Sequence, residues 1–144
     1  MSAGHNLDRL AARTAQGIVG DRKGDEATKL ENMATKALGV VQENGVYAGM
    51  LFLYSRTSKE DKTPAEAIRT QLLAMLGKDE IVSLELAFTG NAREALWLAV
   101  SDHLIGKVTS DLDKLLLVKE LYEQTLIYVR YGAKAAGGER DGHA

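Results

Sequence analysis

The chain has 144 residues, of which 45% are hydrophobic and 26% are charged, a length and composition typical of one domain with a core of its own. The formal net charge of −2 excludes a globally basic nucleic-acid-binding protein, so any such role would have to come from a local basic face. Cysteine is absent, which excludes disulfides, thiolate metal ligands and cysteine nucleophiles.

Two helices are predicted in the first third of the chain. The first spans residues 6–19, where Asn6 is a favoured N-cap and apolar residues follow at helical spacing. The second spans residues 25–43, where Asp25 and Glu26 suit the positive end of a helix dipole and an apolar stripe follows.

The next segment, residues 46–57, is predicted to be the central helix of the fold. Asn44-Gly45 precedes it and predicts a break, because glycine adopts the left-handed conformation that ends many helices. The segment is apolar nearly all round, so we expect burial on several sides. Ala48 and Gly49 are small enough to allow another helix to approach closely.

A helix over residues 63–76 is predicted from the start signal Thr63-Pro64-Ala65-Glu66, with Thr63 as the cap and Glu66 closing a capping box. Residues 78–88 show the alternation of a strand. Because we find no partner strand to accept its backbone hydrogen bonds, this segment is also predicted to be helical.

Two further helices complete the chain. Asn91 is a favoured cap, with an acidic residue three positions on, and predicts a helix over residues 92–106. Ser110 and Asp111 begin the longest predicted helix, which continues to about Ala136 with apolar residues in a seven-residue repeat.

The predicted architecture is therefore all-α: a compact single-domain bundle of five to seven helices over residues 1–144, with flexible ends at 1–5 and 137–144. No apolar run is long enough to span a membrane, and the first residues lack the apolar core of a signal peptide. We therefore expect a soluble cytoplasmic protein that does not act on membranes.

No catalytic constellation is evident, and we predict no enzyme activity, no metal and no cofactor. His5 and His143 lie near the chain ends, and His103 follows Asp102 on a predicted helix, where adjacent residues point in different directions. His103 is therefore expected to be a packed or surface residue. No Gly-Lys-Ser/Thr phosphate loop follows the glycines of the central segment.

Basic residues recur on single helix faces. Lys29 and Lys36 are seven residues apart on one predicted helix, and Arg130 and Lys134 are four apart on another. Such spacing can follow a phosphate backbone. Spacing alone nevertheless favours an ordinary solvated face, because nearby glutamates such as Glu31 can pair with these cations.

Three segments resemble a known family. Residues 44–59, NGVYAGMLFLYSRTSK, resemble the Asn-Gly-Leu…Ala-Phe-Leu…Ser-Lys segment of the small subunit of type III-B CRISPR effector (Cmr) complexes. Residues 29–45, KLENMATKALGVVQENG, are similar to the helix that leads to the Asn-Gly break in that family. Residues 117–139, LVKELYEQTLIYVRYGAKAAGGE, are similar to its closing helix, with its Ala-Leu-x-Trp/Tyr-Leu-x-Arg-x-Ala pattern.

The resemblance implies a non-catalytic, all-helical subunit that stacks head to tail with its own copies beside the crRNA-bearing backbone subunits. Its basic faces would hold crRNA and target RNA through phosphates without reading bases, while other subunits cleave. Five candidate RNA-binding residues are carried over from the matched segments, and Lys36 is added because it shares a helix face with Lys29. The candidate RNA-binding residues are Lys29, Lys36, Arg56, Lys59, Arg130 and Lys134.

Three alternatives remain open at this stage. The chain could be the small subunit of a type III-A or another CRISPR effector, which its genomic neighbours would reveal. It could instead be a helical protein–protein adaptor that uses no nucleic acid. A small enzyme with a site assembled from scattered residues is the least favoured.

Overall fold

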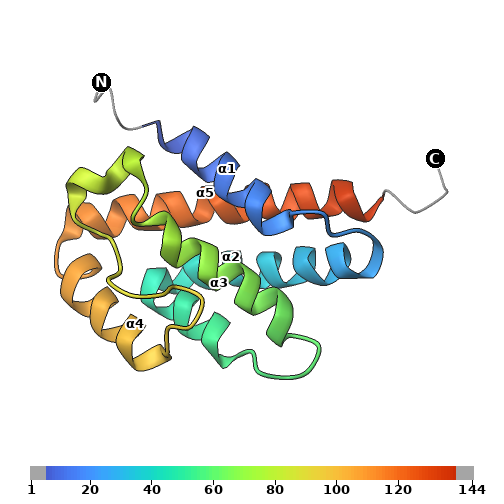
Figure 1. The fold of residues 1–144 in the computed structure, drawn as a ribbon, viewed down its shortest axis with the longest axis horizontal. Coiled ribbons are helices and arrows are strands. Elements are labelled where there is room, and N and C mark those ends of the chain that lie inside the picture. Colours follow the sequence, from blue (N-terminus) through green and yellow to red (C-terminus); the bar gives the residue numbers. More distant parts are fainter. Residues whose placement is uncertain (1–5, 139–144) are drawn as a thin grey trace.

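The computed structural model describes residues 6–138, and this part of the chain is helical without any strand, which confirms the predicted all-α bundle of five to seven helices (Figure 1). In chain order the elements are the α-helices α1 (Leu7–Val19), α2 (Gly24–Ser55) and α3 (Lys62–Met75), the 3₁₀-helix η1 (Asp79–Leu84), α4 (Trp97–His103), the π-helix η2 (Leu104–Val108) and α5 (Leu112–Gly137).

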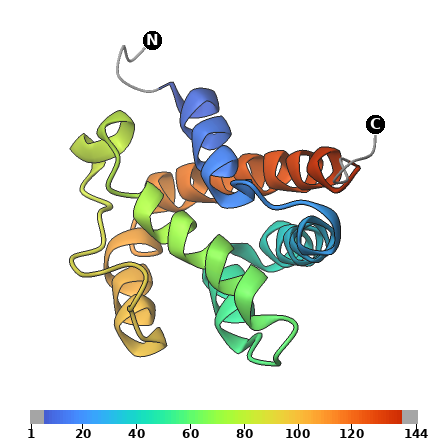
Figure 2. The same ribbon diagram turned by 45° about the vertical axis from the view of Figure 1, so that its right-hand side comes forward.

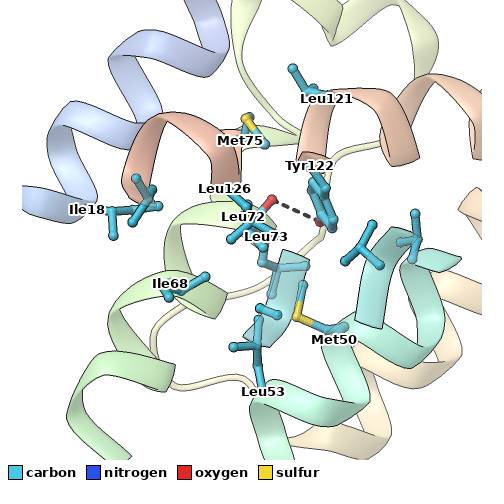
Figure 3. Close-up of a cluster of buried hydrophobic side chains, with 14 of the residues drawn as sticks. Ile18, Met50, Leu53, Ile68, Leu72, Leu73, Met75, Leu121, Tyr122 and Leu126 are labelled. Atoms are coloured by element: carbon cyan, nitrogen blue, oxygen red, sulfur yellow. Dashed lines mark hydrogen bonds between the residues drawn. The ribbon is translucent and has the colours of Figure 1, made fainter. Parts of the chain in front are cut away.

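The two longest helices, α2 and α5, form the most extensive contact in the structure, and α1 and α3 pack across them (Figures 1 and 2). The core lies where these four helices meet. Its side chains are almost entirely apolar, and a phenol, Tyr122 of α5, donates a hydrogen bond to the Leu72 carbonyl of α3 at 3.0 Å (Figure 3). This bond satisfies a hydroxyl that burial would otherwise leave unpaired.

Helix α2 is continuous across the predicted break, but it is sharply kinked there. Gly45 has φ 95° and ψ −176°, a conformation that is essentially restricted to glycine, so the break falls at the predicted position as a kink rather than a loop. Beyond the kink the helix buries Met50 and Leu53. Leu51 is 43% exposed, so one side of this apolar segment faces solvent while Met50 and Leu53 face the core.

The close approach predicted at the small residues of this segment comes from α2 itself. A Cβ atom on Gly49 would lie 2.4 Å from Cγ2 of Val41, far inside van der Waals contact. Because Val41 precedes the kink and Gly49 follows it, glycine here allows the two halves of α2 to pack against each other.

Helix α3 begins earlier than predicted. Its first residue is Lys62, and the preceding turn is closed by the Ser58 hydroxyl, which accepts a hydrogen bond from the Asp61 amide at 3.2 Å. Thr63 is therefore inside the helix and does not cap it. Pro64 sits in the first turn, where its missing N–H leaves no helical hydrogen bond unmade.

The segment after α3 is only partly helical. Residues 79–84 form the 3₁₀-helix η1, which ends at Glu85 in the left-handed conformation (φ 58°). Asn91 accepts hydrogen bonds from the Arg93 and Glu94 amides, as a cap would, but this closes an isolated turn. The predicted helix over residues 92–106 therefore begins five residues late, at Trp97, and changes into a π-helix at Leu104.

An aromatic cluster explains where α4 begins. The Trp97 ring lies 5.3 Å from the rings of both Tyr47 and Tyr54 on α2. The Tyr54 hydroxyl donates to the Ala95 carbonyl at 2.9 Å, and the Tyr47 and Ser101 hydroxyls are 2.8 Å apart. These contacts with α2 hold the start of α4 in place.

The first and last helices follow the prediction closely. The Asn6 side chain accepts from the Arg9 amide and the Asp111 side chain accepts from the Lys114 amide, so both expected caps are formed. Helix α5 ends at Gly137, with Gly138 as its C-cap. The flexible ends predicted at 1–5 and 137–144 otherwise lie outside the described residues.

Candidate nucleic-acid interface

Three of the candidate residues meet in one groove. Lys29 and Lys59 line a hollow of about 420 Å³ between the first half of α2 and the start of α3, and Lys29 and Lys36 line an adjoining hollow of about 170 Å³. The two hollows share Lys29, Glu60 and Pro64, so we treat them together as the α2–α3 groove.

The kink in α2 makes this meeting possible. A straight helix from Lys29 to Ser55 would rise about 39 Å, at 1.5 Å per residue, and would carry Lys59 far from Lys29. The change of direction at Gly45 turns the second half of α2 back toward the first, as the ribbon shows (Figure 1). The groove therefore depends on the conformation of one glycine.

The charges in the groove are mixed. Lys29, Lys36 and Lys59 are exposed, and none of them takes part in an ion pair with another described residue. Glu26 and Glu60 line the same hollows and lower the net positive charge. Such a surface can bind phosphate groups through mobile ammonium groups, with a modest affinity at each subunit.

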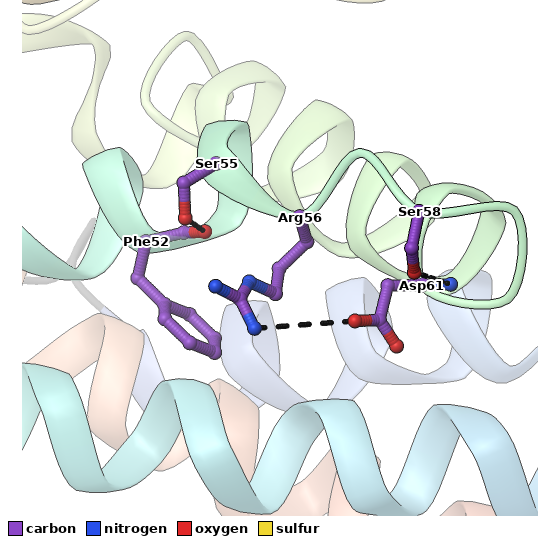
Figure 4. Close-up of polar contacts among 5 residues, drawn as sticks. All are labelled: Phe52, Ser55, Arg56, Ser58 and Asp61. Carbon is purple, nitrogen blue, oxygen red and sulfur yellow. Dashed lines mark hydrogen bonds and ion pairs between the residues drawn. The ribbon is translucent and has the colours of Figure 1, made fainter.

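Arg56 is largely occupied by contacts within the chain (Figure 4). Its guanidinium lies over the Phe52 ring, 4.9 Å from the centroid, and its Nη1 atom is 3.9 Å from a carboxylate oxygen of Asp61. Its Nε atom is buried without a hydrogen-bond partner among the described residues. Arg56 thus borders the groove through Asp61 and offers only part of its donor set to a ligand.

Arg130 and Lys134 lie on another surface. Both are exposed on α5 and neither lines the α2–α3 groove. Each is two residues from Gly132, which packs against Val19 of α1, and two residues correspond to about 200° around a helix of 3.6 residues per turn. Their side chains therefore point away from α1, and the six candidates divide into two groups.

The structure adds one basic residue that the sequence did not single out. Arg22 lines the groove from the loop between α1 and α2, and its Nη1 atom donates to the Ile18 carbonyl at 2.6 Å. Its position depends on how α1 packs across α2 and α3, and we find no sequence signal that would have identified it.

Residues 6–138 hold neither a cluster of three or more histidine, cysteine, aspartate or glutamate residues that could hold a metal nor a helix that could span a membrane. His103 is packed as expected, with Nε2 2.8 Å from the Leu86 carbonyl and its ring edge-on to Phe88.

Comparison with known proteins gives no family. No protein-family model matches the chain, and no curated protein or solved structure matches it. The relation to CRISPR small subunits therefore stays a prediction from the three resembling segments.

Proposed function

We propose that this chain is a non-catalytic, RNA-binding small subunit of a type III-B CRISPR effector complex, and that the α2–α3 groove holds the phosphate backbone of bound RNA. The observation that carries the proposal is the meeting of Lys29, Lys36 and Lys59, from two segments far apart in sequence, in one groove where none of them is ion-paired with a described residue.

The arrangement supports backbone contact rather than base recognition. Lys29 and Lys36 are two turns apart, about 10 Å along the axis of α2, and Lys59 lies across the groove from Lys29. Lysines act as flexible point charges, which suit phosphates of any sequence. Because glutamates share the groove, one subunit alone should bind weakly, and several copies along one RNA would bind tightly through avidity.

A titration of the isolated protein with labelled single-stranded RNA over a range of salt concentrations tests the groove. Each phosphate contact on a single strand contributes about −0.7 to the slope of log affinity against log salt, so three lysine contacts should contribute about −2. The triple variant Lys29→Gln/Lys36→Gln/Lys59→Gln should lose that part of the slope and weaken binding to all RNA sequences alike.

A matched control removes the same charge elsewhere. Arg9, Lys107 and Lys114 line none of the hollows of the groove, and the variant Arg9→Gln/Lys107→Gln/Lys114→Gln should keep most of the salt slope. Equal losses in the two triple variants would mean that only overall charge matters. The pair Arg130→Gln/Lys134→Gln measures the contribution of the α5 surface separately.

A protein–protein adaptor is the second candidate function, and exposed leucines favour it. Leu96 and Leu98, at the start of α4, are 77% and 72% exposed, and Leu112, at the start of α5, is 66% exposed. Where such side chains form one contiguous patch, they mark a surface that contacts another protein. Self-association or partner binding that the lysine variants leave unchanged, in a protein that binds no RNA, would favour the adaptor.

The CRISPR subtype is a separate question. A small subunit of a type III-A or another effector would use the same groove in the same way, and the genes beside this one would distinguish these cases. Neither alternative changes the proposed chemistry of the groove.

A further inference from the structure

A second cavity adjoins the α2–α3 groove. It has a volume of about 240 Å³ and lies between the end of α1, the loop after it, α3 and the turn at Arg93. Its polar lining is Arg22, Thr63, Glu66, Thr70, Gln71 and Arg93. We call it the Arg22–Arg93 cavity. Because ligand pockets for drug-sized molecules usually measure about 300–1,000 Å³, this volume suits a single small group.

Two guanidinium groups supply its positive charge. Arg22 is anchored by the 2.6 Å hydrogen bond to the Ile18 carbonyl, and the backbone of Arg93 is fixed by the 2.9 Å bond from its amide to the Asn91 side chain. Neither guanidinium is within 4.0 Å of a carboxylate oxygen among residues 6–138. Guanidinium offers several donors in a planar fork that matches oxyanions, so both arginines are available to an anion.

Thr70 provides an independent sign of a binding site. Its hydroxyl oxygen is shielded from solvent and has no hydrogen-bond partner in the described chain. A native protein seldom keeps a buried, unpaired hydroxyl without a reason. Thr70 itself lines the cavity, so a ligand there would lie beside this residue.

Glu66 determines which anion fits. Its carboxylate lines the same cavity and can only accept hydrogen bonds when ionised. An anion beside it must therefore carry a proton of its own. Inorganic phosphate keeps at least one proton throughout the neutral range. A phosphate monoester, whose second pKa is about 6, keeps its proton in about half of its molecules at pH 6 and in about a tenth at pH 7. Sulfate and phosphate diesters have none at either pH.

We propose that the Arg22–Arg93 cavity binds a protonatable phosphate group, either inorganic phosphate or a phosphate monoester. The two arginines would donate to its oxygens, and its P–O–H group would donate a hydrogen bond to the Glu66 carboxylate. This site is distinct in chemistry from the α2–α3 groove, because the internal phosphates of RNA are diesters and would be rejected. The proposal does not rest on RNA binding by the groove.

Calorimetric titration of the full chain at pH 6, where about half of a phosphate monoester carries the proton, tests the selectivity. The probes are inorganic phosphate, sulfate, uridine 5′-monophosphate and dimethyl phosphate. We expect phosphate or the monoester to bind at least tenfold more tightly than sulfate and dimethyl phosphate. Equal binding of phosphate and sulfate, or no binding by either phosphate or the monoester, would overturn the proposal.

Three variants test the roles of the residues. Arg93→Gln should weaken phosphate binding at least tenfold, and because Arg93 is exposed, the melting temperature should not change. Glu66→Gln should raise sulfate affinity toward that of phosphate, since the amide can donate to an unprotonated oxygen. Arg9→Gln, outside the cavity, is the control and should leave binding unchanged. Unchanged phosphate affinity in Arg93→Gln would also overturn the proposal.

The source of the phosphate follows from a last comparison. Tight binding of inorganic phosphate indicates the free ion, and tighter binding of the nucleotide indicates a small ester. If a 5′-phosphorylated RNA binds more tightly than both small probes in a manner that requires Arg93, and the same RNA with a 5′-hydroxyl does not, the ligand is the terminal phosphate of an RNA. All three outcomes support a site for a protonatable phosphate group.

Discussion

Replacement of Gly45 by alanine tests the kink on which the groove depends. Gly45 has φ 95° and ψ −176°, and an L-residue held in this region costs about 1–3 kcal/mol. No atom lies within 4 Å of the position that the new Cβ would take, so the whole cost comes from the backbone and none from a clash. We therefore expect Gly45→Ala to destabilise the protein by that amount.

Gly39→Ala is the matched control in the same helix. It also has no atom within 4 Å of the new Cβ, but its backbone is helical, so alanine should stabilise the helix by about 0.5–1 kcal/mol. The same substitution at two positions six residues apart should thus change the free energy of unfolding in opposite directions. Urea unfolding followed by circular dichroism measures both free energies, and thermal midpoints should shift by about 2–4 °C per kcal/mol.

The groove supplies a second readout for the same variant. If alanine straightens α2, Lys59 moves away from Lys29 and the RNA affinity at low salt should fall in Gly45→Ala but not in Gly39→Ala. Stabilisation by both substitutions would refute the reasoning, because it would mean that α2 passes through residue 45 with ordinary helical dihedrals.

Two further substitutions probe the packing around α2 and the core. Gly49→Ala should lower the free energy of unfolding by about 1–3 kcal/mol, because its Cβ would lie 2.4 Å from Cγ2 of Val41. In a double-mutant cycle, Val41→Ala should relieve part of that loss. Strictly additive effects of the two substitutions would exclude the contact. Burial raises the pKa of Tyr122 above its ordinary value, so the folded state keeps a proton that the unfolded chain loses near pH 10, and stability should fall as pH rises through about 10. Tyr122→Phe should lower the free energy of unfolding by about 0.5–1.5 kcal/mol at neutral pH and reduce the fall in stability above about pH 10. If urea unfolding shows the same fall in stability in this variant, Tyr122 is not its cause.

The surface tyrosine Tyr128 offers a comparison for the alkaline profile. Its hydrogen bond to the Asp8 carboxylate raises the pKa of its phenol, which gives an alkaline loss of the same sign. Because this phenol is exposed to solvent, Tyr128→Phe should change the profile less than Tyr122→Phe does. A larger effect of Tyr128→Phe in the same unfolding series would place the alkaline sensitivity at the α1–α5 contact instead of the core.

The sequence predicted those helix ends that local chemistry determines. Asn6 and Asp111 cap the first and last helices because an N-cap side chain needs only the backbone amides a few residues ahead. Asn91 has the same chemistry and makes the same bonds, yet the helix begins only at Trp97. That start depends on the Trp97 contacts with α2, which are distant in sequence and leave no local signal.

The candidate site was predictable to a similar extent. Helical periodicity places Lys29 and Lys36 on one helix face, and in the structure both residues line the α2–α3 groove. Their meeting with Lys59 depends on the angle of the kink at Gly45, which a glycine in a sequence permits but does not specify. The separation of Arg130 from this groove depends on which face of α5 packs against α1, and the resemblance to a family does not contain that information.

Affinity purification of the tagged protein from its native host at low salt tests the proposed function most directly. The bound RNA would be sequenced and the bound proteins identified. The proposal predicts that a discrete RNA of guide length and large CRISPR backbone subunits are recovered with the protein. Because the basic surfaces hold the assembly, both should be lost in a variant that carries all five substitutions Lys29→Gln, Lys36→Gln, Lys59→Gln, Arg130→Gln and Lys134→Gln. A protein recovered without RNA, or with partners unrelated to CRISPR, would contradict the proposal and favour the adaptor.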